Sequence, residues 1–63
     1  MEQRRWYTVA DAATYLSVSR YAIRDAVWQG ILPYVRMGKR FIFDRHDLDR
    51  WAESKKRLEP AFG

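Results

Sequence analysis

Five basic side chains within one stretch of the sequence carry the whole net positive charge of the chain. The stretch runs from Ser19 to Phe43 and contains a single acid, Asp25, so its net charge is +4. In the remainder of the chain basic and acidic residues balance, at seven of each. The five basic residues are Arg20, Arg24, Arg36, Lys39 and Arg40. A local concentration of positive charge attracts a polyanion, and nucleic acid is the usual one.

Length and composition indicate one small domain that folds without disulfides or metals. The 63 residues have room for a single core, to which three Trp, four Tyr and three Phe can contribute large buried areas. The sequence has no cysteine and one histidine, His46, which disfavours a metal site. No nucleophile is paired with a base and no glycine-rich phosphate loop is present, so we expect neither catalysis nor a cofactor. No apolar run approaches the ~20 residues of a membrane span, and we expect a cytoplasmic protein.

Capping residues and apolar spacing predict two short helices separated by a tight turn. Thr8 is the expected N-cap of the first helix, with Asp11 three residues later in a capping-box arrangement. Apolar residues recur at helical spacing along this helix and predict a buried stripe of Val9, Ala12, Ala13 and Leu16. Ser19 is the expected N-cap of a second helix, from Arg20 to about Gln29, which Gly30 ends.

Two β-rich runs around a glycine-containing loop predict a hairpin after the second helix. The runs are residues 34–36 and 40–43, and the loop contains Gly38. Asp44 is then the expected N-cap of a third helix from about residue 45 to 57. Trp51 is expected to be its largest contribution to the core.

These elements fit a single domain. We expect a flexible N-terminus at residues 1–6, the domain at 7–57 and a tail at 58–63. The expected fold class is mainly α with a small β-hairpin, in the order helix, turn, second helix, two-stranded hairpin and C-terminal helix. Two short helices joined by a tight turn, the second with a basic and aromatic exposed face, form the helix-turn-helix pattern.

Residues 7 to 51 resemble the excisionase-type (MerR-like) family of winged helix-turn-helix domains. The resemblance rests on ordered landmarks over most of the chain: Ala12-Ala13, Tyr15-Leu16, Val18-Ser19-Arg20, Gly30, Leu32-Pro33, Gly38-Lys39-Arg40, Asp47-Leu48 and Trp51. The sequence departs from the family at two positions of the second helix. Ala22 stands where many relatives have Thr, and Trp28 stands where a basic residue is common.

The resemblance implies a module that binds double-stranded DNA, with the second helix in the major groove and the hairpin wing on the neighbouring backbone or minor groove. Short members of the family are often excisionases, which bind and bend DNA beside an integrase and act as recombination directionality factors. The resemblance therefore implies an integrase, a tyrosine recombinase, as partner, and the small footprint of one domain favours further copies of the chain side by side on DNA. One alternative is a small transcriptional regulator of a phage or mobile element, and a second is a protein-interaction module.

The candidate contacts on the second helix are Ser19, Arg20, Tyr21 and Arg24. Arginine can form paired hydrogen bonds to guanine or hold phosphate, and which of the two arginines reads a base stays open. The alternative is a solvated face whose arginines pair with acids. Tyr21 can contact phosphate or a thymine methyl, or lie flat on the helix. Ser19 is first a helix cap and can also contact phosphate.

The candidate contacts on the wing are Arg36, Lys39 and Arg40. Gly38 allows the loop to turn tightly and approach a backbone, although a tip this polar is also typical of an ordinary solvated turn. Arg36 has the alternative of pairing with an acid. Trp28 either covers the wing, which is the interpretation we favour from sequence, or is an exposed contact for another protein.

Overall fold

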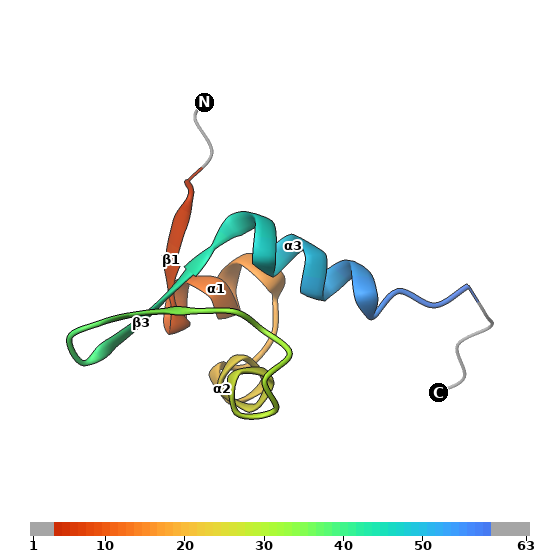
Figure 1. Ribbon diagram of the computed structural model, residues 1–63. Helices are drawn as coiled ribbons and strands as arrows, with labels where there is room; N and C mark the ends of the chain where they lie inside the picture. The colour runs from red at the N-terminus through yellow and green to blue at the C-terminus, as the bar shows by residue number, and fades with distance from the viewer. Residues whose placement is uncertain (1–3, 59–63) are drawn as a thin grey trace.

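Residues 4–58, which the computed structural model describes, form three helices and a three-stranded sheet (Figure 1). The elements in chain order are β1 (Trp6–Thr8), α1 (Val9–Leu16), α2 (Arg20–Trp28), β2 (Val35–Met37), β3 (Arg40–Asp44) and α3 (Arg45–Ser54). Helix α1 packs against α2, α3 and the sheet, and so connects all parts of the domain.

The sheet has the order β1-β3-β2, and both pairings are antiparallel. The hairpin of β2 and β3 was expected, whereas β1 was not. Trp6, which we expected in the flexible N-terminus, pairs with Asp44 at the start of α3, and Tyr7 pairs with Phe43. A strand of three residues shows no alternating pattern in the sequence, so only its contact with β3 defines it. Residues 1–3 of the expected flexible segment, and residues 59–63 of the expected tail, lie outside the described part.

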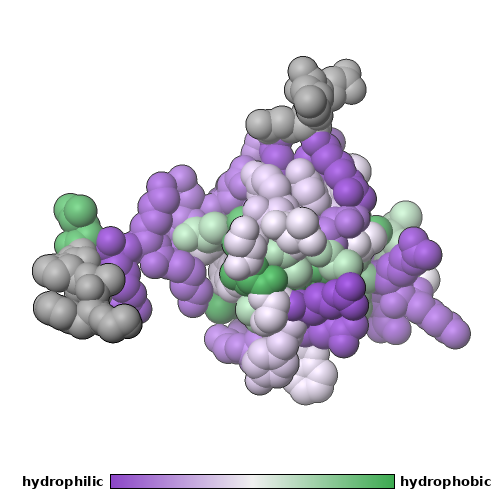
Figure 2. Space-filling view, turned by 180° about the vertical axis from the view of Figure 1, so that it is seen from behind, coloured by the Kyte–Doolittle hydropathy of each residue, from purple (hydrophilic) through white to green (hydrophobic). Residues whose placement is uncertain are grey.

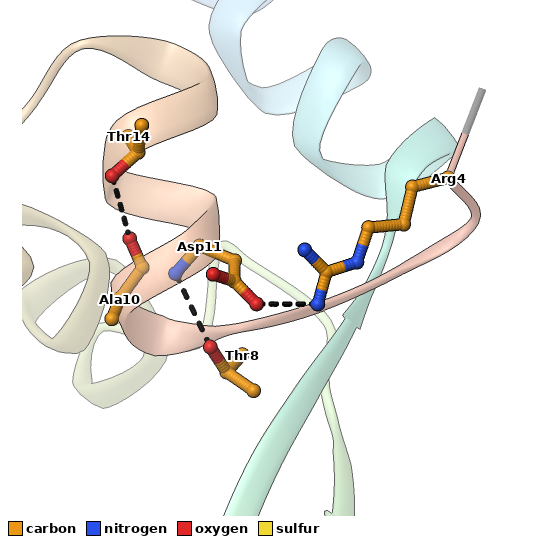
Figure 3. A network of polar contacts seen from close by, with 5 residues as sticks. All are labelled: Arg4, Thr8, Ala10, Asp11 and Thr14. Carbon is orange, nitrogen blue, oxygen red and sulfur yellow. Dashed lines mark hydrogen bonds and ion pairs between the residues drawn. The ribbon is translucent and has the colours of Figure 1, made fainter. Parts of the chain in front are cut away.

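The start of α1 is fixed by its predicted cap and by an additional ion pair (Figure 3). The hydroxyl of Thr8 accepts a hydrogen bond from the backbone N–H of Asp11, at 3.2 Å. The guanidinium of Arg4 binds the carboxylate of Asp11. The Thr8 hydroxyl and then the Arg4 contact hold the pKa of Asp11 below its ordinary value.

The turn between α1 and α2 depends on a left-handed residue. Ser17 has φ 57° and ψ 41°, a conformation that side chains with a Cβ rarely adopt. Its geometry allows the N–H of Val18 to donate to the carbonyl of Ala13 at 2.9 Å, which closes the helix end. The chain then reaches Ser19, whose hydroxyl accepts the N–H of Ala22 at 3.1 Å and caps α2 as predicted.

Gly30 ends α2, as the sequence indicates. It has φ +74°, and the N–H of the following Ile31 donates to the carbonyl of Ala26 at 3.1 Å. This closing pattern directs the chain back to the core, where Leu32 is buried. Helix α2 itself ends at Trp28, with Gln29 as its cap.

Helix α3 is shorter than expected, since it ends at Ser54 rather than near residue 57. Residues 55–57 are basic and exposed, so burial of apolar surface does not extend the helix through them. The expectation for Trp51 is also corrected. Trp51 is only half-buried at the edge of the core, and the largest fully buried side chain is Phe43.

The core lies between α1, α2, α3 and the inner face of the sheet. Its buried residues are Tyr7, Ala12, Ala13, Ile23, Ala26, Leu32, Phe43 and Leu48. Small alanines on α1 and α2 allow these helices to approach closely, while Phe43 and Leu48 fill the space towards β3 and α3. Three helices with a small antiparallel sheet are the winged helix-turn-helix architecture, which confirms the expected fold class. Within residues 4–58, no helix is long and apolar enough to span a bilayer.

We predict that the conformation of Ser17 limits stability. Ser17→Gly should be neutral or stabilising by up to about 1 kcal/mol, because glycine adopts positive φ without Cβ strain. Ser17→Val should destabilise the domain by about 1–2 kcal/mol, since a β-branched side chain tolerates this region worst. Urea unfolding followed by circular dichroism measures both, and an unchanged Ser17→Val midpoint would contradict the prediction.

We also predict that Asp44 makes stability depend on acid pH. The N–H of His46 donates to its carboxylate at 3.0 Å and the guanidinium of Arg5 lies 3.4 Å away. The His46 N–H and then Arg5 lower the pKa of Asp44 below 3.8 in the folded chain, so the carboxylate stabilises the fold above that pH. This contribution is lost as the pH falls through the depressed pKa.

Asp44→Asn should keep the cap but remove the charge, and thermal melts of both proteins between about pH 2 and 7 provide the test. The variant should melt below the native chain at neutral pH, and the two Tm values should converge in acid. A constant difference in Tm at every pH would contradict this account of Asp44.

Candidate nucleic-acid interface

The helix-turn-helix and the wing enclose a groove of about 430 Å³ on one side of the domain. Four of the sequence-predicted contact residues line it: Arg20 and Arg24 from α2, and Lys39 and Arg40 from the wing. The complete lining is Thr8, Val9, Ala10, Arg20, Arg24, Lys39, Arg40 and Phe41. The fold thus brings cations that lie up to twenty positions apart in the sequence to one concave surface, which we call the basic groove.

Helix α2 presents its arginines to the basic groove because its opposite face is fixed in the core. Ile23 and Ala26 are buried against α1, which leaves the opposite side of the helix to solvent. Arg20 is the first residue of α2, and Arg24 lies one helical turn later on the same side. The cap at Ser19 leaves the positive end of the α2 dipole beside Arg20.

None of the four cations of the basic groove forms an ion pair with an acid of residues 4–58. The alternative of arginines neutralised by Asp25 or by acids of α3 is therefore not realised. Asp25 instead accepts a hydrogen bond from the side chain of Gln29. The charge of the basic groove is left for an anionic partner.

The wing turns at a glycine in the left-handed region. Gly38 has φ +65°, and Met37 and Arg40 pair on either side of the two-residue loop Gly38-Lys39. A glycine at the first loop position matches the right-handed twist of the strands. Arg36 does not line the basic groove, since its Nε donates to the carbonyl of Gly38 at 3.3 Å. It therefore supports the tip from β2.

The start of α1 is a part of the basic groove that the sequence-based prediction missed. Thr8, Val9 and Ala10 line the groove together with residues of α2 and the wing. The first backbone N–H groups of a helix have no partner within the helix, and they carry partial positive charge. The predicted cap at Thr8 was the available signal, because it shows where these groups begin. Two helix N-termini thus add to the four cationic side chains.

Residues 6–56 match the family described as a helix-turn-helix domain, which is most of the chain. The chain belongs to this family. Membership supports DNA binding, and the basic groove lies between the second helix of the motif and the wing. The chain is also 28% identical over 60 residues to the uncharacterized protein YvgK of Bacillus subtilis (strain 168). The match covers 95% of this chain and 20% of YvgK, so the chain spans about a fifth of that relative's length. No solved structure matches the chain significantly.

In this helix-turn-helix domain the aromatic residues of α2 project into solvent. Tyr21 is 76% exposed and Trp28 is 86% exposed. The expectation that Trp28 covers the wing is wrong, because Trp28 lies on the side of α2 that faces away from the core. With Arg24 and Asp25 these residues line a shallow hollow of about 280 Å³ next to the basic groove. Arg24 lines both concavities.

A second exposed surface of the helix-turn-helix domain is apolar and lies on the outer face of the sheet. Trp6, Val35, Met37 and Ile42 line a hollow of about 390 Å³ there. Successive side chains of a strand point to opposite faces of the sheet. Tyr7 and Phe43 are buried in the core, so the adjacent Trp6 and Ile42 lie on the outer face. Seen from behind the view of Figure 1, most of the visible surface of the domain is hydrophilic, with a small hydrophobic area near its centre (Figure 2).

Outside the basic groove, the hydroxyl of Tyr15 forms a hydrogen bond that stabilises the packing of two helices. The hydroxyl of Tyr15 donates to Asp49 at 2.6 Å and so joins α1 to α3. This hydrogen bond raises the pKa of Tyr15 above its ordinary value of 10.0. Within residues 4–58 no group of three or more His, Cys, Asp or Glu side chains is arranged to hold a metal ion.

Proposed function

We propose that this chain binds double-stranded DNA by sequence, without catalysis, through the basic groove. The observation that carries the proposal is the convergence of Arg20, Arg24, Lys39 and Arg40 on one surface without an acidic partner among residues 4–58. Like charges so close together repel one another, and the phosphates of a duplex relieve that repulsion.

In the proposed complex α2 lies in the major groove, whose width of about 12 Å admits a helix. Arg20, Tyr21 and Arg24 then face base edges and phosphates, and Ser19 lies near the backbone at the helix start. Lys39 and Arg40 hold the adjacent backbone, with Arg36 supporting them from β2. The domain from residue 7 to 57 is the DNA-binding unit in this proposal, and the protein acts in the cytoplasm.

We further propose that the chain is an excisionase, a recombination directionality factor that binds and bends DNA beside an integrase of the tyrosine recombinase type. The resemblance of residues 7–51 to excisionase-type domains supports this role. One domain of this size covers few base pairs, so specificity requires several copies side by side or a partner protein. Trp28, exposed at the end of α2, is a candidate contact for such a neighbour. The alternative is a small transcriptional regulator of a phage or mobile element with the same DNA contacts.

We predict a steep salt dependence of duplex binding that the wing residues account for in part. About four to six neutralised phosphates give a slope of log K against log salt near −4 to −5. Lys39→Ala/Arg40→Ala should make that slope shallower by about 2 and weaken binding at every salt concentration. Fluorescence anisotropy with a labelled duplex measures both.

The matched control is Lys55→Ala/Lys56→Ala, which removes the same charge from an exposed segment after α3. This control should keep the native slope to within one unit. A flat salt response of the native chain would contradict DNA binding. Equal losses in the two double variants would show that net charge, rather than the wing, determines affinity.

The role in recombination is tested by an excision assay with the integrase encoded nearest to this chain's gene and its attachment-site DNA. We predict that the native chain increases excision about tenfold or more, and that Arg24→Ala abolishes the increase because it removes the arginine that lines both concavities. Unchanged excision, together with altered transcription from a neighbouring promoter, would instead establish the regulator.

A further inference from the structure

The exposed face of α2 carries one acid, which directly follows Arg24, and the structure shows how that acid is held. Asp25 is the single acidic residue between Ser19 and Phe43. It lies in the hollow beside the basic groove, between Tyr21 and Trp28 and next to Arg24. Neither Arg20 nor Arg24 forms an ion pair with it. Its position is therefore not explained by neutralising a neighbouring arginine.

Asp25 is bound by Gln29, which follows one helical turn later. The side-chain amide of Gln29 donates from Nε2 to Oδ2 of Asp25. A carboxylate only accepts hydrogen bonds, so this contact fixes the amide with its nitrogen towards Asp25. Oδ1 of Asp25 and Oε1 of Gln29 form no hydrogen bond within residues 4–58. The pair thus presents two acceptor oxygens beside Arg24, which can only donate, and Tyr21, whose hydroxyl can donate or accept.

We propose that Asp25, oriented by Gln29, selects at one position of one strand for a base that displays an amino group in the major groove, with cytosine preferred. This inference rests on the proposed function, in which α2 enters that groove. The donors displayed there are N4 of cytosine and N6 of adenine, and acidic side chains pair with cytosine N4. The acceptors of guanine and thymine face a carboxylate without a proton to share. Guanine and thymine are disfavoured for two reasons. Their acceptor atoms repel the Asp25 carboxylate, and the carboxylate oxygen is left buried without a hydrogen bond.

The position of Asp25 on α2 agrees with this role. It lies five residues after Arg20, which corresponds to about 7.5 Å along the helix axis. That distance is about two base-pair steps of 3.4 Å each. A guanine held by Arg20 and a cytosine amino group held by Asp25 therefore fall within one short segment of the same groove. In this arrangement Arg20 and Asp25 contact different base pairs of the DNA site.

The test compares binding-site selection from a randomised duplex library by the native chain, Asp25→Asn and Glu53→Gln. Asparagine keeps the size of the side chain but loses the charge and gains a donor. Glu53→Gln removes the same charge from the exposed side of α3 and is the matched control. Sites selected by the native chain should contain cytosine at one position, about tenfold over guanine. The control should retain that preference.

Asp25→Asn should lose the cytosine preference while its affinity for random duplex stays equal or rises severalfold, since a charge repelling phosphate is removed. An unchanged base preference in Asp25→Asn would overturn the inference and leave the proposed function standing. Loss of affinity for random duplex in this variant, with native circular dichroism, would also overturn it. Failure of the native chain to bind duplex at all would overturn the proposed function itself.

Discussion

The arrangement of the basic groove depends on the central position of β3 in the sheet. This strand pairs with β1 on one side and with β2 on the other, and it buries Phe43 in the core. Its first residue, Arg40, is at the wing tip, whereas its last residue, Asp44, caps α3. One strand therefore connects the wing to the helices without a flexible joint. The pairing of β3 thus positions the backbone that carries the wing cations relative to the core against which α2 packs.

Electrostatics and packing act in opposite directions on this surface. The unpaired cations repel one another, so the basic groove costs stability in the free chain. The small core has to offset that cost, and it does so with fully buried side chains from every helix and from β3. Binding of a polyanion removes the repulsion, which couples ligand binding to stability. For the single acid on the same face, Asp25, we propose a contribution to selectivity rather than to affinity.

The sequence predicted those features that depend on neighbouring residues. Thr8, Ser19 and Gly30 have local chemistry that marks helix ends, and the structure confirms each of them. Strand β1 was missed because its three residues are defined by pairing with β3, which a local pattern cannot show. Trp51 and Trp28 were misjudged for a related reason, since the burial of a large side chain depends on the distant surfaces it meets. The four cations of the basic groove were all predicted, but their convergence with the start of α1 appears only in the tertiary structure.

We propose that α2, the wing and the start of α1 act together as one surface for duplex DNA. Titration of the ¹⁵N-labelled chain with a short duplex, followed by NMR, tests it most directly. We expect the largest amide shifts at residues 8–10, 19–25 and 38–41, with little change along the exposed side of α3. Shifts confined to the outer face of the sheet, around Trp6, Val35 and Met37, would contradict it.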